Sequence, residues 1–416
     1  MQLRYGYGSG EQQLYISAKH PLRELRANEI AAPTDEAGEV LRALNAPIGT
    51  RLLREIVKPG EKIAIITSDI TRPMPTHIVM EPLLAELAAA GVEMADVALI
   101  FALGSHRFHT EAEMKKLAGD FAWGQIRCMD GDPSNCVHMG TTSRGTPVDI
   151  VRIVAEADRR ICLGNIEYHY FAGYSGGAKA IMPGVSTREA IQNNHSRMIE
   201  VAACAGKISG NPVREDIEEA AALVGVDFIV NVVLDEHKKI VKAFAGDVTL
   251  AHREGCAFLD SMYQAKIAER ADIVVASQGG APKDLNLYQT QKALDNAKHA
   301  VRKGGIIVLV GACGEGFGEH VFEQWMTSAP TPASMIERIA VDFQLGGHKA
   351  AAIAMVLEDA QIFMVSQMDG EMVRRMGMVP FSDVQAAFDA AEKEMGEDAS
   401  VISMPFGGST LPVVMG

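Results

Sequence analysis

One segment, Lys62-Ile63-Ala64-Ile65-Ile66-Thr67, is a continuous, mostly apolar run that leads into the polar stretch Ser68-Asp69-Ile70-Thr71-Arg72. A run without polar alternation indicates a strand that is buried on both faces, as in a parallel sheet. The same pattern recurs along the chain, with helical stretches and Gly- or polar-rich loops between the runs. The other runs cover residues 97–103, 160–164, 273–276, 306–310 and 362–365. Strands that alternate with helices predict an α/β fold with largely parallel sheets.

Local signals predict a hairpin and several helix boundaries. Residues 228–244 contain two apolar runs around Asp235-Glu236-His237-Lys238, which favours an antiparallel hairpin. Thr110 and Ser186 are each followed by a glutamate three residues later, the capping-box pattern of a helix start. Asn211 before a proline predicts another helix start. A charged helix is predicted over residues 263–270.

The chain of 416 residues is long enough for two or three domains, at ~150 residues each. We expect two α/β domains with an active-site cleft between them. The N-terminal domain is predicted over residues 1–268, with the last ~20 residues as a candidate addition. The C-terminal domain is predicted over residues 269–395.

Composition excludes several classes of protein. Lys and Arg number 39 against 53 Asp and Glu, a net charge of −14 that argues against a general nucleic-acid or anionic-membrane binder. We expect no membrane span, because no apolar run reaches ~18 residues, and no signal peptide at the N-terminus. The cysteines are scattered, at positions 128, 136, 162, 204, 256 and 313. This usage is typical of reduced thiols and predicts a cytoplasmic protein. The overall composition is that of an ordinary globular protein, and we expect an enzyme.

Reactive side chains follow four of the predicted strands, where ligands bind in parallel α/β sheets. The segments are Ser68 to Pro73, Gly104 to Arg107, Asn165 to Lys179, and Gln278 to Lys292. The third contains Gly173-Tyr174-Ser175-Gly176-Gly177-Ala178-Lys179, which has the small residues and lysine of an anion cradle. It is not a Walker A loop, and no Gly-x-Gly-x-x-Gly follows any strand, so a common NAD enzyme is disfavoured. The alternative is a flexible loop without ligand.

Single residues in these segments suggest chemistry. His106 and His169 each follow a strand, and two imidazoles suit acid/base work on two faces of a substrate. His195 lies in a predicted helix without a second ligand at metal spacing, so alone it is a poor metal site. Arg72 and Lys292 are candidate carboxylate binders. The alternative for each histidine is a structural role, and for each cation a solvated surface position.

These motifs together resemble the nickel-dependent lactate racemases and their 2-hydroxyacid racemase and epimerase relatives. The His169 segment is the most specific part of the resemblance. The matching residues are Ser68-Asp69-x-Thr71-Arg72-Pro73, Gly104-x-His106-Arg107, His169-Tyr170-Phe171-x-Gly173-Tyr174-Ser175-Gly176-Gly177-Ala178-Lys179, Pro183-Gly184-Val185, His195, and Tyr288-Gln289-x-x-Lys292.

The resemblance implies a cofactor, the nickel pincer nucleotide, a pyridinium-3-thioamide-5-thiocarboxylic acid mononucleotide that holds Ni(II). It implies covalent attachment of this cofactor at Lys179 and one protein ligand to nickel, His195. Three donors from the cofactor and one imidazole would complete a square-planar site, which Ni(II) accepts. The further nucleotide contacts that it implies are Asp69, Thr71, Gly176, Gly177, Pro183 and Gly184.

The resemblance also implies an activity. His106 and His169 would be the catalytic acid and base, and Arg72, Lys292, Gln289 and Tyr288 would bind the substrate. Proton-coupled hydride transfer to and from the cofactor would invert C2 of a 2-hydroxy acid through a 2-keto acid. In this reading residues 1–268 bind the cofactor and residues 269–395 close over the substrate. The partners implied are the small-molecule substrate and, indirectly, the proteins that synthesise the cofactor.

The class of protein, its substrate and the role of one segment remain open at this stage. The same residues could serve a nucleotide-dependent oxidoreductase or a non-catalytic nucleotide-binding protein. Within the racemase reading, the substrate could be lactate or a larger, dicarboxylic or sugar acid. We expect His348 or Lys349, in the segment Gly346-Gly347-His348-Lys349-Ala350, to border the substituent on C2. The alternative for that segment is a helix-capping loop.

Overall fold

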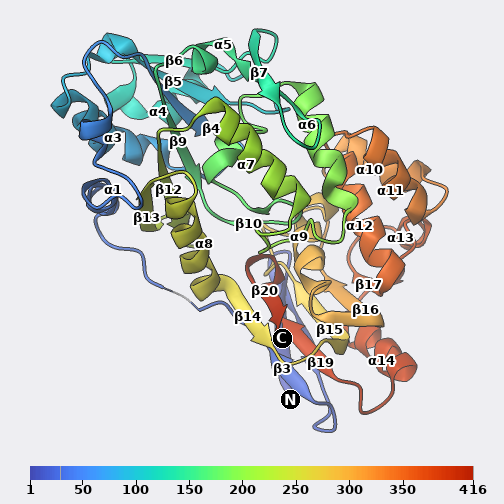
Figure 1. Ribbon diagram of the computed structural model, residues 1–416. Helices are drawn as coiled ribbons and strands as arrows, with labels where there is room; N and C mark the ends of the chain where they lie inside the picture. Colours follow the sequence, from blue (N-terminus) through green and yellow to red (C-terminus); the bar gives the residue numbers. More distant parts are fainter. Residues whose placement is uncertain (29, 416) are drawn as a thin grey trace. The chain divides into compact units, whose positions relative to one another are not determined.

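The computed structural model describes residues 1–28 and 30–415, which form two compact units (Figure 1). The central unit comprises residues 30–261, and the terminal unit combines residues 1–28 with 262–415. Each unit is built around a six-stranded sheet whose strand pairs are mostly parallel. The predicted α/β fold with largely parallel sheets is therefore confirmed.

The sheet of the central unit is parallel except at one edge, where β12 and β13 form the predicted antiparallel hairpin. Its strands lie in the order β13 (Ile240–Gly246), β12 (Phe228–Leu234), β9 (Arg159–Asn165), β4 (Ile63–Ser68), β5 (Val97–Ala102) and β6 (Arg127–Asp130). Two small antiparallel hairpins complete the unit: β7 (Cys136–Thr141) with β8 (Pro147–Val151), and β10 (Tyr168–His169) with β11 (Gly173–Tyr174).

Several helices of this unit begin at a residue whose side chain caps the first turn. They are α1 (Glu36–Asn45), α2 (Leu53–Ile56), α3 (Thr76–Ala89), α4 (Glu111–Ala122), α5 (Arg152–Ala155), α6 (Arg188–His195), α7 (Pro212–Val224) and α8 (Leu250–Tyr263). The predicted capping box at Thr110 is confirmed, and so is Asn211 as the cap of α7. The predicted cap at Ser186 is wrong. Thr187 caps α6, because the hydroxyl of Ser186 donates instead to the carbonyl of Ile181.

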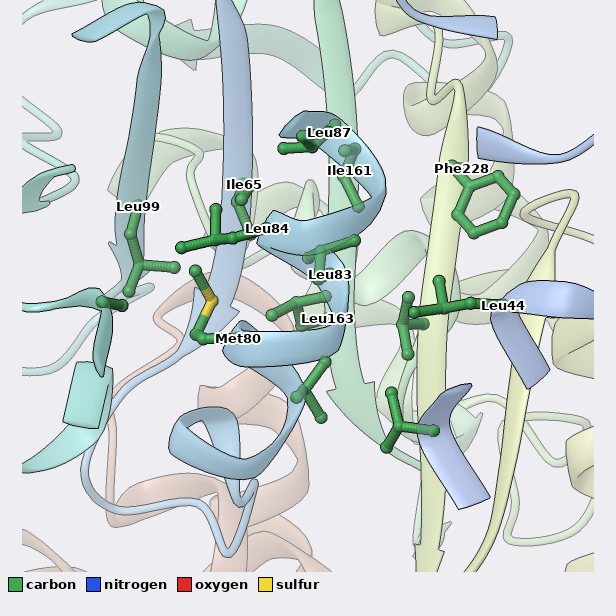
Figure 2. Close-up of a cluster of buried hydrophobic side chains, with 14 of the residues drawn as sticks. Leu44, Ile65, Met80, Leu83, Leu84, Leu87, Leu99, Ile161, Leu163 and Phe228 are labelled. Carbon is green, nitrogen blue, oxygen red and sulfur yellow. The ribbon is translucent and has the colours of Figure 1, made fainter. Parts of the chain in front are cut away.

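The core of the central unit lies between one face of its sheet and helices α1 and α3 (Figure 2). Alternate strand residues, including Ile65, Leu99 and Ile161, point to this face. Helix α3 covers them with Met80, Leu83, Leu84 and Leu87, which share one helix face at helical spacing. Burial of each large side chain contributes roughly 1.5–3 kcal/mol. This core holds the strands firmly, so that the loops at their carboxyl ends have a fixed base.

The sheet of the terminal unit is parallel throughout. Its order is β18 (Val379–Phe381), β17 (Gln361–Val365), β16 (Val301–Val310), β15 (Ala271–Ser277), β19 (Val401–Met404) and β3 (Leu22–Glu24). The hairpin of β1 (Gln2–Tyr7) and β2 (Gly10–Tyr15) and the pair of β14 (Gln264–Ile267) and β20 (Leu411–Val414) accompany it. Its helices are α9 (Leu287–Ala297), α10 (His320–Ser328), α11 (Pro332–Val341), α12 (Gly347–Asp359), α13 (Gly370–Arg375) and α14 (Val384–Met395).

The compact units differ from the domain boundaries expected from sequence. Residues 1–28 belong with the second half of the chain, because β3 pairs with β19 and the hydroxyl of Tyr5 hydrogen-bonds to Ser403. The last ~20 residues also pack there rather than onto the first half, since β19 and β20 pair with β15 and β14. The helix predicted over residues 263–270 is wrong. Residues 264–267 form β14, because they find hydrogen-bond partners in β20, far away in sequence.

Candidate active site

The loops that follow β4, β5 and β9 carry most of the predicted site residues of the central unit. Asp69, Thr71 and Arg72 follow β4, and His106 follows β5. The long segment after β9 carries His169 and leads through Lys179 to α6. Since the carboxyl ends of parallel strands meet at one edge of a sheet, these loops lie at the position where α/β proteins bind ligands.

His106 is oriented by Asp69. Its Nδ1 lies 2.6 Å from Oδ2 of Asp69, and the hydroxyl of Thr71 donates to Oδ1 of the same carboxylate at 2.9 Å. Burial alone would raise the pKa of Asp69, but the hydrogen bonds from His106 and Thr71 and the charge of Arg72 outweigh it and lower that pKa. The ionised carboxylate therefore places a proton on Nδ1 of His106, which leaves a lone pair on Nε2. Asp69 and Thr71, expected to contact the nucleotide, here hold the histidine.

A second histidine–carboxylate pair, missed in the sequence, supports the same loop. Nδ1 of His109 lies 2.5 Å from Asp130 at the end of β6, and Nε2 of His109 accepts the backbone N–H of Ile70 at 3.0 Å. The His109 side chain is only 1% exposed. Ile70 lies between Asp69 and Thr71, so His109 fixes the backbone on which the first pair depends. The sequence signal was a second histidine three residues after His106.

His169 lies on the β10–β11 hairpin. Its Nδ1 accepts the backbone N–H of Ala172 at 3.2 Å, so the neutral ring carries its proton on Nε2. The ring of Phe171 lies against two histidines edge to face, with centroids 4.5 Å from His169 and 4.9 Å from His195. The structure therefore brings the predicted acid/base residue and the predicted metal ligand into contact with the same aromatic ring.

The hairpin that carries His169 is tied to α8 through one carboxylate. The hydroxyls of Tyr168 and Tyr174 both donate to Asp260, at 2.8 and 2.9 Å. The net effect on the pKa of Asp260 is an increase, because burial raises it by more than the two hydrogen bonds lower it. Sequence reasoning gave no role to Asp260, because the only local signal was a carboxylate on a distant helix.

The glycine-rich loop that leads to Lys179 is packed, not open. The backbone N–H of Gly177 donates to Oδ1 of Asn231 at 2.7 Å. Gly176 and Gly177 have positive φ values of 75° and 56°. A Cβ added at either position would lie 2.8 Å from a side-chain atom, of Asn231 or of His252 respectively. The loop therefore needs glycine for both its backbone angles and its close approaches.

The surroundings of Lys179 disfavour the charged form of its amino group. Burial of its amino group, followed by the charges of Arg214 and Arg72, lowers the pKa of Lys179 well below its ordinary value. Arg214 is fully buried on α7, where it contacts His252 at 2.6 Å and Glu218 at 3.1 Å. A neutral amine is a nucleophile and can form a covalent bond with a carboxyl derivative. Arg214 was not predicted, because nothing in its local sequence shows that it lies beneath this loop.

The predicted residues Pro183 and Gly184 connect the loops. Gly184 donates its backbone N–H to the carbonyl of Lys179 at 3.2 Å, and its own carbonyl accepts the N–H of Gly104 at 2.9 Å. The Met182–Pro183 bond is cis. A Cβ on Gly184 would lie 2.1 Å from the carbonyl oxygen of Ala180. The backbone here thus links the lysine loop to the loop that carries His106.

His195 lies at the C-terminal end of α6 and is buried. The side-chain nitrogen of Asn194 donates to the carbonyl of Val213 at 3.1 Å, so the amide oxygen faces Nδ1 of His195 at 2.8 Å. Nδ1 must then carry the proton, which leaves the lone pair on Nε2. Among the residues described, no group of three or more His, Cys, Asp or Glu side chains is arranged to hold a metal ion.

The remaining predicted residues lie in the terminal unit, at the start of α9. Asn286 caps this helix by accepting the N–H of Gln289 at 3.1 Å, and Lys292 follows one turn after Tyr288 and Gln289. Gln289 and Lys292 are exposed. Lys349 lies in the first turn of α12, buried, with its amino group 3.9 Å from the ring centre of Tyr288 and donating to the Tyr288 carbonyl.

A strand-end histidine held by a carboxylate, together with a lysine of lowered pKa on the loop after β9, is typical of an α/β enzyme. Family models described as the lactate racemase N-terminal domain and the lactate racemase C-terminal domain match residues 7–206 and 266–412. Lactate racemase from Thermoanaerobacterium thermosaccharolyticum is 34% identical over 396 residues, which covers 93% of this chain and 92% of the relative. Lactate racemase from Lactiplantibacillus plantarum is 31% identical over 382 residues, 89% and 90% of the two chains.

Solved structures agree. The lactate racemase apoprotein from Thermoanaerobacterium thermosaccharolyticum has a TM-score of 0.88 at 32% identity, covering 99% of this chain and 100% of that one. A protein from Thermotoga maritima shares the fold, with a TM-score of 0.64 at 16% identity over 92% of this chain and all of that one. The chain belongs to the lactate racemase family and is an isomerase. Neither the oxidoreductase nor the non-catalytic alternative is retained. In the part of the chain that the structure describes, no helix is both long and apolar enough to cross a membrane.

Proposed function

We propose that this chain is a nickel-dependent racemase of lactate or a closely related 2-hydroxy acid. One observation carries the proposal: in a chain 34% identical to a lactate racemase, a strand-end histidine is oriented by a carboxylate, and the loop after β9 carries a lysine whose pKa is lowered by burial and two arginines. A neutral lysine suits covalent attachment, and the oriented histidine suits proton transfer. Neither property is needed by a lysine or a histidine that only packs.

The residues present fit the nickel pincer nucleotide. Lys179 has the neutral amine that attachment requires, and the Nδ1 proton of His195 leaves Nε2 as a nitrogen donor for Ni(II). When bound, this cofactor supplies a hydride acceptor and donor for C2 of the substrate. Asp69, Thr71, Gly176, Gly177, Pro183 and Gly184 are proposed to surround the nucleotide. The T. thermosaccharolyticum structure is described as an apoprotein, which agrees with a family that takes a cofactor.

His106 and His169 are the proposed proton-transfer residues. Nε2 of His106 takes the proton of the substrate hydroxyl, and the Asp69 carboxylate at Nδ1 stabilises the imidazolium that forms. His169 presents an N–H at Nε2 toward the substrate oxygen while its Nδ1 accepts from Ala172. The roles reverse for the opposite enantiomer, so one residue works as the base and the other as the acid in each direction.

Substrate binding is assigned to four residues. Arg72 follows β4 in the loop fixed by His109, and its guanidinium can hold a carboxylate with two parallel hydrogen bonds. Lys292, Gln289 and Tyr288 on the first turns of α9 are the other proposed contacts. We also propose a cytoplasmic location, since all six cysteines are free thiols. The partners are the hydroxy acid and, indirectly, the enzymes that make the cofactor.

The test uses full-length protein produced together with the cofactor-synthesis enzymes. Intact-protein mass spectrometry should find a mononucleotide adduct that maps to Lys179, metal analysis should find about one nickel per chain, and L-lactate should become a racemic mixture. His169→Ala should keep the adduct and the nickel but lose racemisation, while Lys179→Ala should lose the adduct. Absence of adduct and nickel from the wild-type protein, despite proven cofactor synthesis, would refute the proposal.

A further inference from the structure

A buried carboxylate, Asp216 on α7, has no role in the chemistry described so far. Its side chain is fully buried and accepts three hydrogen bonds. Oδ1 accepts the hydroxyl of Thr142 at 2.5 Å. Oδ2 accepts the hydroxyl of Thr146 at 2.7 Å and the side-chain nitrogen of Asn194 at 2.7 Å. A buried charge is weak evidence for stability, because its desolvation offsets much of what its contacts contribute.

The bond to Asn194 determines which way the amide points. A carboxylate can only accept, and so can the carbonyl of Val213, the other partner of the Asn194 nitrogen. Both therefore hold the NH₂ group of Asn194, and the bond to Asp216 is the stronger because it is charge-assisted. The amide oxygen is left facing Nδ1 of His195 at 2.8 Å.

We propose that Asp216 is a positioning residue for nickel binding. Its carboxylate fixes the amide of Asn194, and that amide holds His195 with the proton on Nδ1 and the lone pair on Nε2. The inference rests on the proposed function, in which His195 is the protein ligand. Partners of this kind fix the tautomer and ring direction of ligating histidines, and their loss typically lowers metal affinity by 10–100-fold.

The two oxygens of Asp216 have different partners, so a positioning role can be tested separately from a structural role. Oδ2 reaches Asn194, and through it His195, whereas Oδ1 holds Thr142 on the loop after β7. Thr142 also accepts the backbone N–H of Thr146 at 3.1 Å. Thr142→Val therefore removes a buried bond of the same network without touching the path to His195. It is the matched control for a structural effect.

The experiment measures nickel retention in full-length protein produced with the cofactor-synthesis enzymes. Asn194→Ala and Asp216→Ala should keep the nucleotide mass on Lys179 but lose nickel to EDTA roughly 10–100 times faster than wild type. Asp216→Asn keeps an oxygen for the Asn194 nitrogen and should stay close to wild type, as should Thr142→Val. Wild-type retention in Asn194→Ala, or equal loss in Thr142→Val, would overturn the role of Asp216 and leave the proposed function intact.

A second measurement needs neither the cofactor nor the metal. Nitrogen-15 NMR of histidine-labelled wild-type protein without cofactor reports the tautomer of the His195 ring, assigned by the signal missing in His195→Gln. The network predicts the Nδ1–H form, and a ring protonated on Nε2 instead would overturn the inference. A wild-type protein that takes up neither nucleotide nor nickel would overturn the proposed function and this inference with it.

Discussion

Oδ2 of Asp69 lies 2.6 Å from Nδ1 of His106, and the N–H of Ile70, the next residue in the chain, is held by a different histidine, His109, at 3.0 Å. Two histidines thus control one short loop, the first through a side chain and the second through the backbone. Their protonated nitrogens both face carboxylates, of Asp69 and of Asp130. Asp69 therefore sets the tautomer of His106, and His109 separately sets the position of the loop that carries Asp69.

Replacement of Asp69 by Asn should lower kcat by roughly 10²–10⁴-fold, because the amide no longer stabilises an imidazolium at His106. The shape of the side chain is kept, so KM for lactate and the nucleotide mass on Lys179 should change little. Steady-state racemisation, followed by chiral chromatography, measures both constants. A variant with the wild-type kcat would rule out this role for Asp69.

The same residue predicts part of the acid sensitivity of the fold. The pKa of Asp69 is lowered in the folded protein, so its contribution to stability is present above the ordinary aspartate pKa of about 3.9 and is lost as pH falls through the lowered value. Urea unfolding between pH 2 and 5 should therefore show a smaller loss of stability for Asp69→Asn than for wild type. Asp120→Asn, at an exposed carboxylate, is the control and should keep the wild-type dependence.

Lys179 should make the protein without cofactor less stable than it could be. Because its pKa is lowered by folding, the unfolded chain binds the extra proton, and stability should rise with pH up to the ordinary lysine pKa of about 10.4. Lys179→Met should remove this rise and increase Tm at neutral pH, by about 2–4 °C for each 1 kcal/mol regained. Calorimetry can compare it with Lys292→Met, an exposed lysine whose loss should leave Tm unchanged. A lower Tm for Lys179→Met would count against a lowered pKa at Lys179.

His109→Phe should damage the site without touching the substrate. It leaves the Ile70 N–H and Oδ1 of Asp130 without the imidazole that now contacts them, at a cost of about 1–3 kcal/mol for each buried group. We expect a lower free energy of unfolding together with a raised KM, since Arg72 lies in the loop that His109 holds. The control is His138→Phe. His138 is paired with Asp149 at 2.7 Å but is 60% exposed, so its replacement should change neither quantity.

Substrate choice should respond to Lys349. Its amino group lies over the ring of Tyr288 and donates to the Tyr288 carbonyl, which places a buried cation beside a proposed substrate contact. Lys349→Met should lower kcat/KM more for malate or gluconate than for lactate, because a polar or acidic substituent on C2 suits a cation. Unchanged preference across the three acids would remove this idea.

The sheets were predictable from sequence because their signal is local. Each continuous apolar run became a parallel strand, and the caps at Thr110 and Asn211 are made within four residues. Residues 264–267 could not be recognised, since their strand partner lies at 411–414. The predicted site residues of the central unit do gather at strand ends, but their supporting partners Asp130, Arg214, Asp216 and Asp260 come from distant segments. No local sequence pattern distinguishes these four residues from other aspartates and arginines of the chain.

The pairing of β3 with β19 has a consequence for synthesis of the chain. Leu22 leaves the ribosome about 380 residues before Val401, its partner in the sheet, which is roughly 20–80 s at typical rates of translation. Residues 30–261 are continuous and can assemble during that interval. The first 28 residues must wait with an unpaired strand edge, so that stretch is where a chaperone would be most useful to the nascent protein.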